Sequence, residues 1–375
     1  MKRPARVAIL TNVVPAYRVP LFEAFQTMVG HLRIFVSSRT VPGRDWHLFL
    51  ENLDVVVSRT ISRLESFENE QGFADESVIL IPYDTLWMLL RYRPDVIISG
   101  EFGMRTLFSC IYKALFPKTK FILWATLSEH TEAHRGKQRE ALRRWILRRI
   151  DGIFVNGQSG ERYVRSLGFS GKPLAHVSYT IDNEAFRGPA TRPGDDQRWL
   201  FCAGQIIERK GLYPFMIQIV RWCEQHPTRQ VKVTLAGAGA DLARLKSVCA
   251  PANLVIDLPG IATSSQLPGY YHQADISIFP TLADEWGVVV NEALMAGLPI
   301  IASRYSQAVE ELVTDGVNGW VFDPMDERDT YAAIDRALQL DRTSLDRMRQ
   351  AAIDACAGLT PHVVAERMLA LIQQI

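Results

Sequence analysis

The chain has little of what marks secreted, membrane-spanning or nucleic-acid-binding proteins. Its five cysteines are scattered and odd in number, without disulfide or zinc-site spacing, so we expect reduced, buried thiols. A formal net charge of +1 gives no global attraction to nucleic acid. The longest apolar stretch near the middle, 78–90, contains Pro82 and Asp84 and is too short to span a bilayer. The sequence MKRPARVAILTN enters a predicted strand directly, so we expect no signal peptide and a cytoplasmic location.

With those classes set aside, the alternation of strands and helices predicts the fold. A chain of 375 residues, 47% hydrophobic, exceeds one typical core. Short apolar runs alternate with helical periods, which indicates parallel sheets with crossover helices. We predict strands at 6–10, 32–37, 96–99, 121–124, 152–156, 175–178, 199–203, 231–236, 254–257, 276–280, 299–302 and 319–322, and helices at 21–28 and 159–167.

The two series of strands predict an α/β protein with two Rossmann-like domains. The first domain is expected at 1–186 and the second at 198–358, joined by a linker at 187–197 that is rich in Gly, Pro, Arg and Asp. The last segment, 359–375, is expected to be a helix that packs back on the first domain.

Two carboxylates eight positions apart are the most informative feature of the second series. Asp284 lies in a polar loop before Gly287, and Glu292 lies in a segment that otherwise resembles a buried helix. An unpaired buried charge is costly, so Glu292 needs a partner in the protein or in a ligand. An isolated pair of this kind is also explained by a helix-capping acid and a salt-bridged glutamate. The flanking Trp-Gly and Ala-Gly-Leu-Pro favour the functional interpretation.

Glycine-containing turns follow two other predicted strands of the second domain. The sequence GQIIERKG (204–211) follows strand 199–203, where glycine lets backbone amides approach a phosphate and Lys210 supplies a point charge. An ordinary strand-to-helix turn with a surface lysine explains this segment equally well. Gly237 and Gly239 follow strand 231–236, and a lone Gly-x-Gly is more typical of tight packing of a turn on a helix. Open parallel sheets bind ligands at these strand ends.

In order and spacing, residues 201–322 resemble the retaining glycosyltransferases of family 4. That resemblance implies the GT-B fold, two Rossmann-like domains facing across a cleft. It implies that Glu292 binds the ribose hydroxyls of a sugar-nucleotide donor and that the first carboxylate contacts the donor sugar. Asp284 occupies the position of that first carboxylate, which is usually Glu, and Glu285 one step later is the alternative. Lys210 matches the lysine that clamps the donor diphosphate, whereas Gln205 stands where the family has arginine.

The same resemblance implies the composition of the donor site and its chemistry. Lys210, Asp284 and Glu292 are the predicted catalytic residues. The predicted donor-binding residues are Gly204, Gln205, Lys210, Gly237, Gly239, Gly260, Ile261, Glu285, Trp286, Gly287, Val288, Val289 and Glu292. The amides of Val288 and Val289 open a helix whose positive end can face the diphosphate. No Asp-x-Asp motif occurs at the expected diphosphate position, so we expect no metal and no cofactor besides the nucleoside diphosphate sugar.

The first domain offers fewer motifs. Many family members have a Gly-rich loop after the first strand, and this chain has Tyr17 and Arg18 there as candidates for acceptor or phosphate contact. An ordinary loop is an equal alternative. Glu101 ends another strand and is expected to touch the acceptor. Many relatives have a histidine where this chain has Thr126 or its neighbour, which makes Thr126 and His130 further acceptor-side candidates; a solvated loop is the more typical place for His130.

The segment 135–149, RGKQREALRRWILRR, carries seven basic residues and one acid around Trp145 and several aliphatic residues. This pattern predicts a basic amphipathic helix that contacts an anionic membrane surface, with a peripheral location at the inner face of the cell membrane. The alternative is a solvated helix whose apolar stripe packs on the sheet.

Together these observations predict a hexosyltransferase-type enzyme that moves a sugar from a nucleoside diphosphate sugar to a hydroxyl of a glycan or lipid-linked glycan. Such an activity belongs to cell-surface polysaccharide synthesis. Two alternatives remain at this stage: a sugar-nucleotide epimerase or phosphorylase on the same fold, and a non-catalytic scaffold that binds sugar nucleotides or membranes.

Overall fold

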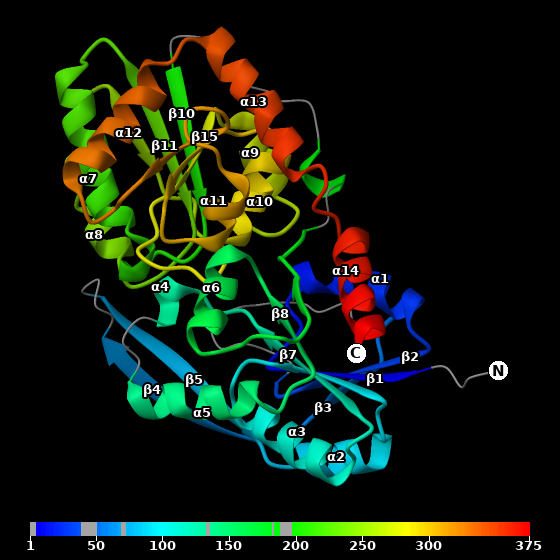
Figure 1. The fold of residues 1–375 in the computed structure, drawn as a ribbon. Helices are drawn as coiled ribbons and strands as arrows, with labels where there is room; N and C mark the ends of the chain where they lie inside the picture. Colours follow the sequence, from blue (N-terminus) through cyan, green and yellow to red (C-terminus); the bar gives the residue numbers. More distant parts are fainter. Residues whose placement is uncertain (1–4, 39–50, 69–72, 133–135, 182–183, 188–196) are drawn as a thin grey trace. The chain divides into compact units, whose positions relative to one another are not determined.

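The computed structural model describes residues 5–38, 51–68, 73–132, 136–181, 184–187 and 197–375 (Figure 1). Most of the predicted linker, 188–196, lies outside these residues. The contacts divide the chain into two compact units. Unit 1 comprises Met1–Phe67, Glu76–Ile181 and Leu359–Ile375, and unit 2 comprises Glu68–Asp75 and Asp182–Gly358.

Unit 1 is built on a parallel sheet of seven strands in the order β3-β2-β1-β6-β7-β8-β9. Its strands are β1 (Arg6–Thr11), β2 (His31–Val36), β3 (Val55–Val57), β6 (Val96–Gly100), β7 (Lys120–Ala125), β8 (Gly152–Val155) and β9 (Leu174–His176). The central strands are apolar on both faces, as expected of a sheet covered by helices on both sides. A separate two-stranded sheet pairs β4 (Thr60–Glu68) with β5 (Ala74–Pro82).

The helices of unit 1 bury apolar stripes against this sheet. One core cluster joins the strands to α2 (Thr85–Tyr92), α3 (Met104–Leu115), α5 (Lys137–Leu147) and α6 (Gln158–Ser166). α2 contacts α3 and α3 contacts α5, so these three helices run side by side (Figure 1). α1 (Val19–Met28) packs against α14 (Pro361–Gln374), the last helix of the chain. The short elements are η1 (Ala16–Arg18) and α4 (Glu129–Glu132).

Unit 2 contains a parallel sheet of six strands in the order β12-β11-β10-β13-β14-β15. The strands are β10 (Gln197–Ala203), β11 (Gln230–Ala236), β12 (Leu254–Asp257), β13 (Ile276–Phe279), β14 (Ile300–Ser303) and β15 (Gly319–Phe322). The helices are α7 (Leu212–Gln225), α8 (Leu242–Lys246), α9 (Leu267–Gln273), α10 (Val288–Met295), α11 (Gln307–Leu312), α12 (Glu327–Gln339) and α13 (Arg342–Cys356), with short turns η2 (Glu184–Phe186) and η3 (Glu208–Lys210).

Every predicted strand is present, and so are the helices predicted at 21–28 and 159–167, so the α/β prediction is confirmed. The strands β3, β4 and β5 were not predicted, and the apolar stretch 78–90 is divided between β5 and α2. Four of the five free cysteines are buried as expected, but Cys249 is exposed. The stretch Arg342–Gln374 is long and apolar enough for a membrane span, yet it comprises two helices, of which α13 packs on α10 and α14 on α1.

Candidate active site

The loop between β13 and α10 in unit 2 holds the first carboxylate beside two cations. The Asp284 carboxylate accepts a hydrogen bond from Lys210 Nζ, and Arg209 Nη1 lies 3.7 Å from the same oxygen, Oδ2. These three side chains are only 16–20% exposed. Lys210 and Arg209 belong to η3, which follows β10, whereas Asp284 follows β13. Because β10 and β13 are neighbouring parallel strands, the segments after their carboxyl ends meet here. This is the sheet edge where open α/β folds bind ligands.

The charges in this group fix the protonation of Asp284. Burial opposes its ionisation, but the charges of Lys210 and Arg209 outweigh burial and hold the pKa of the carboxyl below its usual value. Burial lowers the pKa of Lys210, and the neighbouring Arg209 charge lowers it further, while Asp284 opposes both. The group therefore presents one anion and two cations in a poorly hydrated place.

The second carboxylate has a different neighbour. Glu292 lies on α10 and accepts a hydrogen bond of 2.8 Å from the Tyr271 hydroxyl of α9. Burial raises the pKa of Glu292 to about 7, and the hydrogen bond from Tyr271 only partly opposes this shift. The Tyr271 ring packs edge-on against Phe201, and its hydroxyl supplies the hydrogen-bond partner that a buried Glu292 requires.

The segment after β14 holds in place the loop between β13 and α10, which contains Asp284 and Glu285 and is called the acidic loop below. Gln307 Nε2 donates to the carbonyl of Glu285 at 2.5 Å, and the Ser306 hydroxyl donates to the carbonyl of Trp286. The backbone amide of Asp284 donates to Tyr305 O at 3.0 Å. These contacts join residues that are distant in sequence and have no local pattern, so Ser306 and Gln307 could not be predicted as supports of this loop.

Two of the predicted loop residues serve the loop's own architecture. Trp286 is buried and its Nε1 donates to Asn291 Oδ1 at 2.8 Å. Gly287 has φ +97°, and a Cβ at this position would lie 2.8 Å from the Phe279 ring. Glycine is therefore needed for the loop to enter α10, which begins at Val288 and continues through Val289. Glu285, in contrast, is exposed.

The remaining donor candidates lie in loops at the same edge of the sheet. Gly237 closely approaches the backbone of Gly204, whose carbonyl oxygen would lie 1.7 Å from an added Cβ, and Gly239 approaches Ile206 similarly. These glycines thus let the turns after β10 and β11 touch. Gln205 is half-buried in the first of these turns. Gly260 and Ile261 follow β12, and Ile261 is 76% exposed.

Unit 1 gathers four of the five acceptor-side candidates at the corresponding edge of its sheet. The Arg18 guanidinium lies 4.6 Å from the ring centroids of both Trp124 and Tyr179, and its Nη2 donates to the Tyr179 hydroxyl at 2.7 Å. The Tyr17 ring lies 5.3 Å from that of Tyr179. Arg18 is almost completely buried, so its charge is part of a built site and not of a solvated loop.

Glu101 is the anion of this group in unit 1. Its carboxylate accepts a hydrogen bond from the Thr126 hydroxyl, and its backbone has φ +64°, which is uncommon for a residue other than glycine. Burial raises the pKa of Glu101, whereas Thr126, Arg18 and Arg105 oppose that shift. Arg105 in turn donates to Ser37 Oγ at 2.9 Å and to Asn12 Oδ1. Backbone strain at a half-buried acidic residue is typical of a functional site.

Buried polar atoms without a protein partner lie around this group. They include Arg18 Nε, Trp124 Nε1, Asn156 Oδ1 and Thr180 Oγ1, which come from η1 and from β7, β8 and β9 or the residues just after them. Most buried polar atoms in proteins are hydrogen-bonded, so these four atoms are candidates for contact with a polar ligand.

Two other predicted features of unit 1 lie elsewhere. His130 lies on α4 and is half-buried. In the basic segment, α5 forms as predicted, but Arg143 is buried, where it forms a 2.6 Å ion pair with Glu132 and bonds to the Tyr163 hydroxyl. Arg143 is therefore part of the core and not of a solvent-facing basic surface.

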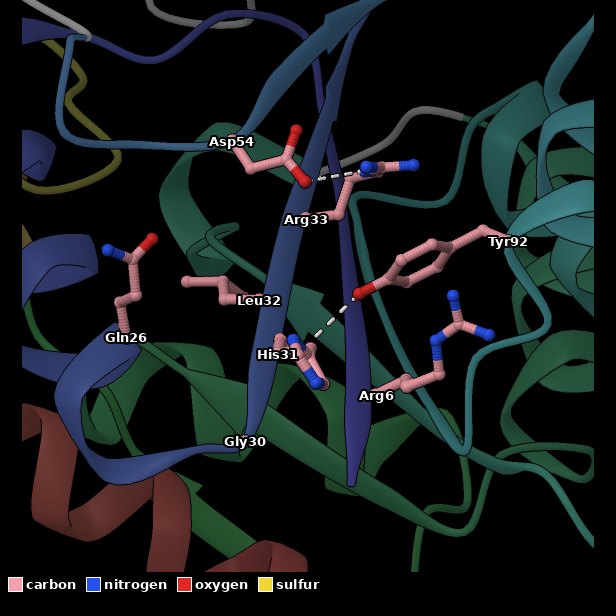
Figure 2. A pocket seen from close by; sticks show the side chains of 8 residues that line it. All are labelled: Arg6, Gln26, Gly30, His31, Leu32, Arg33, Asp54 and Tyr92. Atoms are coloured by element: carbon pink, nitrogen blue, oxygen red, sulfur yellow. Dashed lines mark hydrogen bonds and ion pairs between the residues drawn. The ribbon is translucent and has the colours of Figure 1, made fainter. Parts of the chain in front are cut away.

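A cavity of about 610 Å³ lies at the amino-terminal ends of β1 and β2, at the opposite edge of the unit 1 sheet from the group that contains Arg18 and Glu101 (Figure 2). Arg33 Nε bonds Asp54 Oδ2 at 2.7 Å, and the Arg33 and Arg6 guanidinium groups lie 4.9 and 4.8 Å from the Tyr92 ring centroid. None of the predicted site residues lines this cavity, so we separate it from the active site. Over the described residues, no cluster of three or more His, Cys, Asp or Glu side chains is arranged to hold a metal.

Solved structures share the fold over nearly the whole chain. Sucrose-phosphate synthase from Thermosynechococcus elongatus matches with a TM-score of 0.73 and 16% identity, covering 98% of both chains. Anabaena HepE, solved in complex with UDP and glucose, matches with a TM-score of 0.72 and 12% identity, covering 99% of this chain and 100% of HepE. These likenesses confirm the predicted GT-B fold class.

The sequence comparison then gives the family. Residues 185–355 match the family described as glycosyl transferases group 1. Glycogen synthase of Mycobacterium tuberculosis is 26% identical over 58% of this chain and 52% of its own length. The lipopolysaccharide core biosynthesis mannosyltransferase LpsB of Rhizobium meliloti is 24% identical over 46% and 50%. The chain thus spans about half the length of these curated relatives.

Proposed function

We propose that this protein is a retaining glycosyltransferase that moves a sugar from a nucleoside diphosphate sugar to a hydroxyl of a glycan or lipid-linked glycan. The observation that carries the proposal is the placement of Lys210, Asp284 and Glu292 at the carboxyl edge of the unit 2 sheet, inside the segment that matches the family. HepE, with UDP and glucose bound, and LpsB, a mannosyltransferase by name, support a nucleotide-sugar donor.

In this proposal each residue of unit 2 acts on one part of the donor. Glu292 accepts hydrogen bonds from the ribose hydroxyls, and Asp284 binds the sugar. Lys210 and the amides of Val288 and Val289 stabilise the negative charge that grows on the diphosphate as its bond to the sugar carbon breaks. The acceptor oxygen forms the new bond on the face that the diphosphate leaves, so no enzymic nucleophile is needed.

The acceptor is proposed to bind at the group formed by Tyr17, Arg18, Glu101 and Thr126 in unit 1. Four features support this assignment: buried charges, strained backbone at Glu101, aromatic rings beside Arg18, and unpartnered polar atoms around them. Aromatic rings and paired polar groups are the usual means of holding a sugar ring and its hydroxyls.

We also propose that unit 1 contacts an anionic membrane at the inner face of the cell membrane, where a lipid-linked acceptor would be found. α5 exposes Leu142 and Trp145 beside Arg144, Arg148 and Arg149. Trp87 of α2, and Ile111 and Leu115 of α3, are also exposed, and α2 contacts α3 as α3 contacts α5. Exposed apolar and aromatic side chains surrounded by basic ones are typical of proteins that bind the interface of an anionic bilayer.

The donor can be identified by thermal-shift screening of UDP-, GDP- and ADP-sugars, because a ligand at about 100 times its Kd stabilises the folded protein by roughly 2.7 kcal/mol. Product analysis with and without an acceptor then separates a transferase from an epimerase, which converts the donor alone. Absence of any stabilisation, together with absence of donor turnover, would contradict the proposal.

A further inference from the structure

We propose that Tyr271 is a positioning residue that holds the Glu292 carboxylate in place for the donor and sets the pH range over which the donor binds. This inference rests on the proposed function, in which Glu292 accepts hydrogen bonds from the ribose hydroxyls. Tyr271 belongs to α9 and acts through its hydroxyl on the carboxylate of α10. The role requires no contact between Tyr271 and the donor.

The first argument is that the two oxygens of the Glu292 carboxylate have different surroundings. Oε2 accepts the hydrogen bond of 2.8 Å from the Tyr271 hydroxyl, whereas Oε1 has no hydrogen-bond partner among the residues that the structure describes. A carboxylate that is fixed through one oxygen keeps the other oxygen in a constant place. Oε1 is then available to the ribose hydroxyls, and little side-chain entropy is lost when they bind.

The second argument is that Tyr271 itself is held firmly. Its side chain is fully buried, and its ring packs edge-on against Phe201 of β10 and Phe186 of η2, with ring centroids 4.8 and 5.6 Å apart. Burial, followed by the charge of Glu292, raises the pKa of Tyr271 well above its usual value. The hydroxyl therefore keeps its proton and donates it in the bond to Glu292.

The third argument is that this hydrogen bond is the main protein contact that favours the charged form of Glu292. The bond opposes the effect of burial, which raises the pKa of the carboxyl to about 7. In the described part of the chain, no charged side chain of α11 or α13, the helices packed on α10, affects this carboxyl. The titratable neighbour of the pair is Cys202 of β10, and burial raises the pKa of its thiol to about 12, so it stays neutral.

A purely packing role is the competing explanation, because the Tyr271 ring lies between Phe201 and Phe186. The two roles are separated by removing the hydroxyl alone. Tyr271→Phe keeps the ring and loses the bond to Glu292. A packing role predicts no change in the pH at which Glu292 titrates, whereas a positioning role predicts that this pH rises.

The experiment measures calorimetric affinities of UDP, GDP and ADP between pH 6 and pH 9 for wild type, Tyr271→Phe, Glu292→Gln and the double variant. The matched control is Tyr270→Phe, since the Tyr270 ring also packs on Phe201, with centroids 5.3 Å apart, while the bond to Glu292 comes from the Tyr271 hydroxyl. Ratios of affinities at each pH remove the titration of the nucleotide itself, and circular dichroism checks the fold.

We expect Tyr271→Phe to raise the midpoint of the pH dependence by about one pH unit, which is a tenfold change in proton affinity. The nucleotide should then bind about fivefold more weakly at pH 7, because less of Glu292 is ionised, and the loss should shrink toward pH 9. In the Glu292→Gln background, Tyr271→Phe should have no further effect on the pH profile, and Tyr270→Phe should behave as wild type.

The outcomes distinguish this inference from the proposed function. If wild type binds a nucleoside diphosphate and Glu292→Gln weakens it, but Tyr271→Phe keeps the wild-type pH profile, the role of Tyr271 is wrong and the proposed function stands. The same conclusion follows if Tyr271→Phe changes the profile equally in the Glu292→Gln background. If wild type binds none of the nucleoside diphosphates, both are wrong.

Discussion

Asp284 and Glu292 flank the start of the same helix, yet their surroundings are opposite. Asp284 has two cations at one oxygen, and its pKa is held below the usual value despite burial. Glu292 has a single tyrosine hydroxyl as its partner, and burial raises its pKa to about 7. One carboxylate is therefore fixed as an anion at neutral pH, while the other is close to its titration point.

This difference in surroundings indicates that the two carboxylates have different functions. A carboxylate that is always charged keeps Lys210 and Arg209 in place and offers a constant hydrogen-bond acceptor. A carboxylate that lacks a cation gains most when a ligand donates hydrogen bonds to it, because those bonds stabilise its charged form. Ribose hydroxyls would act in that way on Glu292. The following changes test this division, from the largest expected effect to the smallest.

Removal of Lys210, the cation that bonds to Asp284, should have the largest effect. We expect Lys210→Ala to lower kcat about 100- to 1,000-fold, beyond its loss of donor affinity, because the charge on the leaving diphosphate is greatest in the transition state. Steady-state kinetics with the identified donor measure both quantities. Equal losses in donor affinity and in kcat/KM, with kcat unchanged, would contradict a role in the transition state.

The isosteric substitution at the second carboxylate, Glu292→Gln, should lower the affinity for the nucleotide. Glu292→Gln keeps the shape of the side chain but removes a charged acceptor, which should weaken nucleotide binding by about 1.5–3 kcal/mol, or roughly 10- to 150-fold. Calorimetry measures this loss, and circular dichroism serves as the control for folding. Unchanged nucleotide affinity would rule out the ribose contact.

The pH dependence follows from the raised pKa of Glu292. As pH falls from 8 to 6 the carboxyl takes up a proton, so wild-type donor affinity should fall by about tenfold, whereas Asp284 stays charged. The folded protein binds this proton more tightly than the unfolded chain, so Glu292 reduces stability as pH rises from about 4.5 to about 7, and the loss is complete above that range. Glu292→Gln should therefore show flat donor binding over this range and a higher melting temperature than wild type at pH 8. A pH profile of donor binding shared by wild type and Glu292→Gln would assign the titration to another group.

A substitution of an exposed arginine in unit 1 should leave the function of Asp284 and Glu292 in donor binding unchanged. Arg148 is exposed after α5, and Arg148→Gln should weaken binding to anionic vesicles about fivefold, at roughly 1 kcal/mol per basic residue. Arg347→Gln, which removes an exposed arginine from α13 in unit 2, is the charge-matched control. Co-sedimentation at low and high salt measures the effect, and nucleotide affinity should not change. Binding to neutral and anionic vesicles with equal strength would exclude the electrostatic contact.

The smallest expected effect is that of EDTA. Transfer should persist in its presence if Lys210 and the amides of Val288 and Val289 stabilise the leaving group. If EDTA abolishes transfer and magnesium or manganese restores it, Asp284 and Glu285 have to be reinterpreted as metal ligands.

Local sequence patterns predicted most of the strands and the position of α10, because apolar runs and glycine-containing turns can be recognised from residues that are close in sequence. They also placed Asp284, Lys210 and Glu292 at one sheet edge, since parallel strands share that edge. They did not predict that Tyr271 bonds Glu292 or that Gln307 holds the acidic loop, because these partners are distant in sequence and their pairing depends on tertiary packing. The burial of Arg143 was missed for the same reason, since its partner Glu132 lies before the helix.

The packing of α14 on α1 has a consequence for the order of folding. Unit 1 ends at Ile181 and resumes only at Leu359, so a ribosome completes all of unit 2 before it makes α14. Val364, Ala365, Met368 and Leu371 of α14 are buried, and until they arrive the apolar surface that they cover remains open to water. We therefore expect unit 2 to reach its native state first, while the nascent unit 1 stays prone to aggregation and depends on chaperones until the last helix docks.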